Sequence, residues 1–206
     1  MPTVTKNFSV SAAFMFGFLA AGCGSDDTGS KNPSEVITTL TLSFTPTAGG
    51  AAIVASVNDA DGDGGNPPTI TPVSLAVGAY DMTLKFENRL AMPTVDTTLE
   101  IRDESSQHQI FFTGTAVSGP ANSQKEAPLV HVYGDMDAKG LPVGLSNKIT
   151  AVAGTGMLTV TLRHMPPVNT TPAKTAAAAE TVRSAMRFTT LGGSTDLQVT
   201  FPVSVQ

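Results

Sequence analysis

The chain of 206 residues contains one cysteine, Cys23, and its position makes it a candidate for covalent lipid attachment. The opening segment carries one basic side chain, Lys6, and then no charge from Phe8 to Gly22. A basic start, an apolar stretch and small residues are the layout of a secretory signal. The apolar run is shorter than the ~20 residues that a membrane-spanning helix needs. We therefore predict a cleaved signal peptide at 1–22 rather than a transmembrane anchor.

The residues around this cysteine, Ala20-Ala21-Gly22-Cys23, resemble a bacterial lipobox. The resemblance implies that the Cys23 sulfur receives a diacylglyceryl group and that cleavage makes Cys23 the first residue. Each buried CH₂ contributes about 0.8 kcal/mol to membrane binding, so a stable anchor takes more than one acyl chain. We expect palmitate to be one of these chains. The alternative is an ordinary cleaved signal that leaves a free and reactive thiol.

The residues after the cysteine are polar and predict a flexible tether at 23–34. In Gram-negative bacteria, an aspartate directly after the lipidated cysteine favours retention in the inner membrane. This chain has Gly24 at that position, which favours transport to the outer membrane. The acidic Asp26-Asp27 pair resembles the tether that sends some lipoproteins to the cell surface. We predict a lipid-anchored protein of the outer membrane, facing either the periplasm or the cell exterior.

A run of alternating aspartates, Asp59, Asp61 and Asp63, has the D-x-D-x-D-G opening of a calcium-binding loop. Alternate carboxylates on a tight turn can converge on one Ca²⁺ ion. The twelfth position of the loop is Ile70, where an EF-hand has a glutamate. The loop is therefore a candidate for weak or structural Ca²⁺ binding, and the alternative is a hairpin loop built from ordinary turn residues.

A second D-x-D pair, Asp135 and Asp137, precedes Gly140. The pair could complete a cation site with the first loop. Because aspartate and glycine are typical turn residues, we favour a turn.

Three histidines, His108, His131 and His164, are the remaining candidates for metal chemistry. Histidine with a carboxylate such as Glu104 suits Zn²⁺, and histidine beside Met165 suits copper. None of the spacings is that of a compact metal motif, so any convergence must come from the fold. If their strands are antiparallel neighbours, His108 and His164 lie at the same end of a sheet. We therefore name Glu104, His108 and His164 as a candidate metal site, with strand-end histidines as the alternative.

The sequence offers little for catalysis or nucleic-acid binding. It contains no G-x-S-x-G nucleophile motif, and lipidation would consume the cysteine. Removal of 1–22 leaves 11 basic and 17 acidic side chains, a formal charge of −6. An acidic chain without a basic cluster argues against nucleic acid as a partner. We expect a protein that is not an enzyme and needs no cofactor.

The elements that must position these residues are mostly strands. Threonine, valine, glycine and proline are abundant, and apolar side chains alternate with polar ones, which indicates half-buried strands. The predicted strands are 35–46, 51–59, 79–88, 97–105, 108–114, 128–135, 147–152, 156–164 and 195–206. The alanine-rich segment 171–187 predicts one short helix, with Pro172 at its first position. We predict an all-β fold for 35–206, an antiparallel immunoglobulin-like β-sandwich with one short helical insert.

Several segments, in this order, resemble a group of lipoproteins common in Bacteroidetes: EVITTLTLSFTP, DADGDGGNPP, DESSQHQIFF, GDMDAKGLPVGL, GTGMLTVTLRHMP and TDLQVTFPVSVQ. Members are sometimes labelled as a type 1 periplasmic-binding fold. That fold needs two large α/β lobes, and this chain is too short and too rich in strands for it. The resemblance implies a location in the envelope and a β-sandwich more than it implies an activity.

Two functions are expected from these observations. The first is a non-enzymatic binding or interaction module, with recognition by the loops 59–68, 88–97 and 134–144 at the ends of the sandwich. The alternative is a metal-handling lipoprotein that uses His108 and His164 to supply Zn²⁺ or copper to an outer-membrane transporter. A receptor or transporter of the outer membrane is the expected partner in either case.

Overall fold

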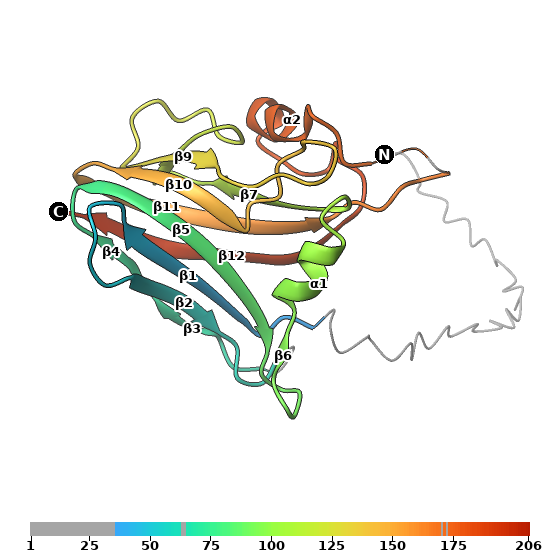
Figure 1. Ribbon diagram of the computed structural model, residues 1–206, viewed down its shortest axis with the longest axis horizontal. Coiled ribbons are helices and arrows are strands. Elements are labelled where there is room, and N and C mark those ends of the chain that lie inside the picture. Colours follow the sequence, from blue (N-terminus) through green and yellow to red (C-terminus); the bar gives the residue numbers. More distant parts are fainter. Residues whose placement is uncertain (1–35, 63–64, 170, 172) are drawn as a thin grey trace, which may run out of the picture. The chain divides into compact units, whose positions relative to one another are not determined.

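A computed structural model describes residues 36–62, 65–169, 171 and 173–206, and these residues form two packed β-sheets (Figure 1). The larger sheet contains, in spatial order, β3 (Thr69–Thr71), β2 (Ile53–Asn58), β1 (Thr39–Pro46), β5 (Gly78–Asn88), β10 (Ser146–Ala151), β9 (Leu129–Tyr133) and β8 (Val117–Ser118), and β6 (Val95–Asp96) pairs with β5. The smaller sheet contains β4 (Val73–Leu75), β12 (Ser194–Val205), β11 (Gly154–His164) and β7 (His108–Thr113). The predicted all-β sandwich is confirmed.

The core forms where the alternating strands turn their apolar faces toward each other. Along β1, Leu40, Leu42 and Phe44 are almost completely buried, as the period of two residues predicts. Equivalent side chains of β5 and of the smaller sheet join them in one apolar cluster. The β1–β2 connection turns at Gly49 and Gly50, whose φ angles of +93° and +124° favour glycine. The predicted hairpin of the first two strands is therefore confirmed.

Two short helices accompany the sheets, α1 (Thr98–Asp103) and α2 (Ala178–Ala185). Alternate residues of β7 point to opposite faces of its sheet, and Phe111 points away from the core between the sheets. Phe111 packs instead with Ala178 and Val182 of α2 and with Met165. The helix therefore covers the outer face of the smaller sheet, and β7 is buried on both faces.

The prediction of a strand at 97–105 is wrong, because this segment contains α1. Thr98 and Ile101, three residues apart, are buried, whereas Leu99 is 53% exposed. A spacing of three is the period of a helix with one buried face. The Asp96 carboxylate also accepts a hydrogen bond from the Thr98 N–H at 3.1 Å, which satisfies a free donor in the first turn.

The other helix and some strand pairs also differ from the expectation. The predicted helix at 171–187 is shorter, Ala178–Ala185, and Pro172 lies outside the described residues. Two strand pairs, β4–β12 and β8–β9, are parallel although we expected antiparallel neighbours. The immunoglobulin-like subtype stays a prediction. Among the described residues, no helix has the length and apolar character needed to cross a membrane.

Candidate metal centre at the β7–β11 end

Two of the three histidines lie opposite each other where β7 begins and β11 ends. The antiparallel register pairs His108 directly with His164, as expected for neighbouring strands. Side chains of directly opposed residues share one face of the sheet. The two imidazole rings stack, with centroids 4.6 Å apart and planes 12° from parallel.

Glu104 reaches the same place from the C-terminal end of α1. It is the C-cap residue of that helix, and a turn of three residues separates it from His108. One carboxylate oxygen, Oε2, lies 3.9 Å from Nε2 of His164. One possible ligand atom from each of Glu104, His108 and His164 lies within 4.8 Å of the other two. The structure thus brings together the three residues that the sequence analysis named.

The backbone of the α1–β7 connection orients the His108 ring. His108 Nδ1 lies 3.2 Å from the carbonyl oxygen of Glu104, which can only accept, so Nδ1 carries the proton and donates. In this tautomer the lone pair of Nε2 is free, as metal binding through Nε2 requires. The same Nε2 lies 3.7 Å from Oδ2 of Asp196.

Asp196 was missed by the sequence analysis. It lies near the start of β12, far along the chain from both histidines, and no spacing motif connects it to them. The pairing of β11 with β12 places His164 opposite Ser194, next to this segment. Strand register across a sheet is not visible in a single sequence, so no local signal could have found it.

A glycine and an arginine hold the start of β12 beside the cluster. Gly193 has φ +79°, and a Cβ atom there would collide with the carbonyl group of His164. Arg163 donates to the carbonyl oxygens of Gly192 and Gly193 at 2.9 and 2.8 Å and to the Thr195 hydroxyl at 2.7 Å. These contacts position the segment that carries Asp196.

Burial shifts the pKa values of two groups here, His108 and Asp196. His108 is 6% exposed, and burial together with the neighbouring His164 lowers the pKa of its imidazole. A neutral imidazole is the form that binds metal. Burial also raises the pKa of the Asp196 carboxyl. His164 Nε2 is enclosed and has no hydrogen-bond partner within the described part of the chain.

The third histidine, His131, belongs to the core and not to this cluster. It is 2% exposed on β9 and packs against Phe112 at 4.3 Å between ring centroids. Its Nε2 lies 2.8 Å from Oδ1 of Asn147. Burial lowers the pKa of His131 to about 4, so the ring is neutral at pH 7.

The predicted calcium loop is described only in part, because Asp63 lies outside the described residues. Oδ2 of Asp61 accepts hydrogen bonds from the backbone and side chain of Asn66 at 3.3 and 2.5 Å. The Asn66 side chain, first among several contacts, lowers the pKa of Asp61. Oδ1 of Asp59 and Oδ1 of Asp61 have no hydrogen-bond partner among the described residues. Calcium binding stays a prediction.

Asp135 and Asp137 act as turn residues, as the sequence analysis favoured. Oδ1 of Asp137 accepts from the N–H groups of Lys139 and Leu141 at 2.8 and 2.9 Å. The carboxylate of Asp135 accepts from three successive N–H groups, those of residues 144–146. Both carboxylates are therefore used to shape the 134–146 segment.

A buried ion pair connects that segment to the chain before α2. Lys174 Nζ lies 2.9 Å from Oδ2 of Asp137, and the two side chains are 0% and 1% exposed. The same Nζ donates to the carbonyl oxygen of Ser105 at 2.8 Å. Three loops that are distant in the sequence meet at this lysine, and one of its partners, Ser105, directly follows Glu104.

Comparison with known proteins adds no identification. No protein-family model matches the chain, and neither the curated proteins nor the solved structures contain a match. The resemblance to Bacteroidetes lipoproteins therefore stays an expectation, and the functional argument depends on the chain's own residues.

Proposed function

We propose that the chain is a lipid-anchored protein of the cell envelope, at the outer membrane, that presents a non-enzymatic binding β-sandwich. The support for the anchor is the apolar run that ends in Ala20-Ala21-Gly22-Cys23, which lies outside the described residues. The support for a binding role is the sandwich itself, which carries loops at its ends where recognition usually occurs.

Replacing Cys23 by serine is expected to abolish membrane anchoring, because the serine hydroxyl cannot accept the thioether-linked lipid. In a Gram-negative host, the wild-type protein should sediment with membranes, incorporate labelled palmitate and show the mass of a chain that starts at an acylated Cys23. The C23S protein should incorporate no label. An unmodified thiol or an intact leader on the wild-type protein would refute the anchor.

A second function, metal handling, is favoured by one observation: the convergence of Glu104, His108 and His164 at the end of the smaller sheet. Two imidazoles and a carboxylate form a donor set that suits Zn²⁺. Asp196 Oδ2 lies 3.7 Å from Nε2 of His108, but Asp196 does not belong to the group of ligand atoms that all lie within 4.8 Å of one another. Supplying the ion to an outer-membrane transporter is the corresponding role in the envelope.

The cluster must contract slightly to bind an ion. Ligand atoms around a tetrahedral Zn²⁺ with bonds of ~2.0–2.1 Å lie roughly 3.3 Å apart. The Glu104–His164 and His108–Asp196 atom pairs are 3.9 and 3.7 Å apart. The imidazole rings are nearly parallel, so their in-plane lone pairs do not yet converge on one point. Metal binding therefore requires a side-chain movement, and His164, at 35% exposed against 8% for His108, is the histidine with more room to rotate.

We expect protein purified without chelator to contain stoichiometric Zn²⁺ or copper by elemental analysis. His108→Ala and His164→Ala should each weaken binding by at least about 100-fold, since each removes a direct ligand. At a free metal concentration 100 times the Kd, the metal should stabilise the fold by about 2.7 kcal/mol. Asp103→Asn, an exposed acid next to Glu104, is the matched control and should bind normally. A well-folded, metal-free protein whose melting temperature does not change when Zn²⁺ or copper is added would contradict the metal role.

A further inference from the structure

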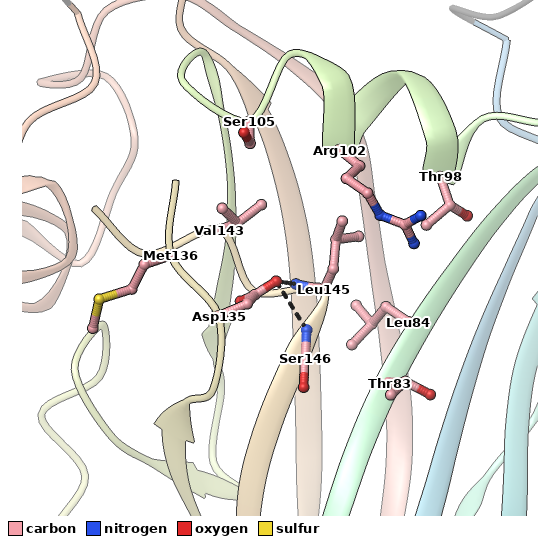
Figure 2. A pocket seen from close by; sticks show the side chains of 10 residues that line it. All are labelled: Thr83, Leu84, Thr98, Arg102, Ser105, Asp135, Met136, Val143, Leu145 and Ser146. Carbon is pink, nitrogen blue, oxygen red and sulfur yellow. Dashed lines mark hydrogen bonds between the residues drawn. The ribbon is translucent and has the colours of Figure 1, made fainter. Parts of the chain in front are cut away.

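A pocket of about 400 Å³ lies beside α1 and shares no residue with the histidine cluster (Figure 2). Its walls come from α1 and the turn that follows it, from β5 and β10 of the larger sheet, and from the 134–146 segment. The lining residues are Thr83, Leu84, Thr98, Arg102, Ser105, Asp135, Met136, Val143, Leu145 and Ser146. The volume is in the range of small-molecule sites and leaves space for a compact organic molecule.

The inner surface of the pocket is mainly apolar. Leu84, Val143 and Leu145 are buried side chains that also line it. Met136 lies at its edge, with 66% of its surface exposed, and its flexible thioether can adapt to different ligand shapes. These side chains would bury the apolar part of a ligand.

One cation, Arg102, reaches into the pocket from above. Figure 2 shows its guanidinium extending from α1 to a position beside Leu145, above Leu84 and toward Thr98. The exposed Arg102 side chain has no hydrogen bond or ion pair among the residues that the structure describes. A guanidinium binds a carboxylate through two parallel N–H donors, and a nearby apolar surface strengthens such a contact.

The acid in the pocket does not compete for Arg102. Oδ1 of Asp135 accepts from the Gly144 N–H at 2.7 Å. Oδ2 accepts from the N–H groups of Leu145 and Ser146 at 2.9 and 3.1 Å, and Figure 2 marks contacts of Asp135 with dashed lines. These three donors satisfy both oxygens of the Asp135 carboxylate and hold it in the wall of the pocket. The cationic edge is thereby left for a ligand.

Hydroxyl groups supply further polar contacts around the pocket. Those of Thr83, Ser105 and Ser146 make no hydrogen bond with any other described residue. The Thr98 hydroxyl is different, because it accepts from the N–H of Phe86 at 2.8 Å and donates to the Phe86 carbonyl oxygen at 3.2 Å. The free hydroxyls can bind a second polar group of a ligand.

We propose that this pocket binds a small organic acid, with the carboxylate at Arg102 and the apolar body against Leu84, Val143 and Leu145. The proposal rests on the binding role proposed above and names the class of ligand that would be bound. The pocket and the histidine cluster share no residue, so substitutions can be made in either site without replacing a residue of the other.

The test is a titration of the purified protein with hexanoate, followed by amide NMR shifts. Hexanamide is the matched neutral probe and hexylamine the matched cation. We expect hexanoate to shift the amides of residues 98–105 and 143–146 and to bind about tenfold more tightly than hexanamide, with hexylamine weakest. The guanidinium–carboxylate contact is the source of this preference.

Arg102→Gln should reduce hexanoate affinity about tenfold, to the level of hexanamide, and leave hexanamide binding unchanged. Arg102 is exposed, so this variant should fold as the wild type does. Arg187→Gln removes an exposed arginine that does not line the pocket and should have no effect. Equal affinity for hexanoate and hexanamide, shifts elsewhere, no shifts at millimolar ligand, or an unchanged Arg102→Gln variant would each overturn the proposal. None of these results would bear on the Cys23 anchor.

Discussion

Replacing Lys174 by methionine is expected to lower the free energy of unfolding by about 3–5 kcal/mol, the usual cost of removing one partner from a buried ion pair. In a domain of this size, that loss corresponds to a fall in melting temperature of about 10 °C. Methionine retains most of the side-chain length and removes the ammonium group. Denaturant unfolding followed by circular dichroism measures the change.

The expected loss is large because both partners are shielded from water and depend on each other. The two side chains are 0% and 1% exposed, and their charged atoms lie 2.9 Å apart. Burial lowers the pKa of Lys174, although the contact with Asp137 opposes that shift. Burial alone would raise the pKa of Asp137, but the Leu141 N–H and the Lys174 ammonium outweigh it, and the pKa is lowered. Without Lys174, the carboxylate would be buried with no cation, and the Ser105 carbonyl would lose a donor.

A double-mutant cycle separates the ion pair from simple packing. Asp137→Asn keeps the Oδ1 acceptor for the N–H groups of Lys139 and Leu141 and removes the charge. The double variant should lose less stability than the two single variants together, with a coupling of about 2 kcal/mol. Lys139→Met, an exposed lysine nearby, is the control and should change stability by less than about 0.5 kcal/mol. Strict additivity in the cycle would show that the pair does not act as a unit.

Lowering the pH from 7 to 4 is expected to destabilise the fold by about 3 kcal/mol through His131 alone. The pKa of His131 is about 4 in the folded protein, against the ordinary value of 6.5 that applies to the unfolded chain. Between these values the unfolded chain binds more protons than the folded chain, so stability falls as the pH falls. Above pH 6.5 the contribution of His131 is complete. Melting temperatures from pH 7.5 to 4 measure the dependence.

His131→Gln provides the comparison, because glutamine does not titrate and its amide can still donate to Oδ1 of Asn147. The variant should be less stable than the wild type at pH 7, since it loses ring contacts with Phe112. Its stability should nevertheless fall less steeply below pH 6.5. Protonation of carboxylates with lowered pKa values, such as Asp137, destabilises both proteins at acid pH. The difference between the two slopes of stability against pH therefore isolates the contribution of His131. Parallel pH profiles would contradict the assignment.

The Lys174 experiment also bears on the candidate metal centre. The carbonyl of Ser105, which Lys174 holds, lies in the α1–β7 connection between Glu104 and His108. The same connection supplies the Glu104 carbonyl that orients His108. The buried lysine is thus one of the groups that determine how the donor set is arranged.

Much of the fold could be predicted from local pattern, because a half-buried strand must alternate. Leu40, Leu42 and Phe44 follow that rule and lie in the core as expected. The pattern failed at 97–105, where Leu99 and Ile101 also alternate but only Ile101 is buried. The hydrogen bond from the Thr98 N–H to the Asp96 carboxylate and the packing of α1 against β5 favour a helix there. Neither contact can be recognised from the spacing of apolar residues in the sequence.

The amino-acid sequence by itself determined the candidate lipid attachment at Cys23, the strand-rich sandwich and the residue types able to bind metal, because each follows from composition and short-range spacing. Only the tertiary structure decided which of those residues meet. The β7–β11 register places His108 opposite His164, the β11–β12 pairing brings in Asp196, and burial separates His131 from both. Register and burial depend on contacts between residues far apart in the chain, and one sequence carries no local record of such contacts.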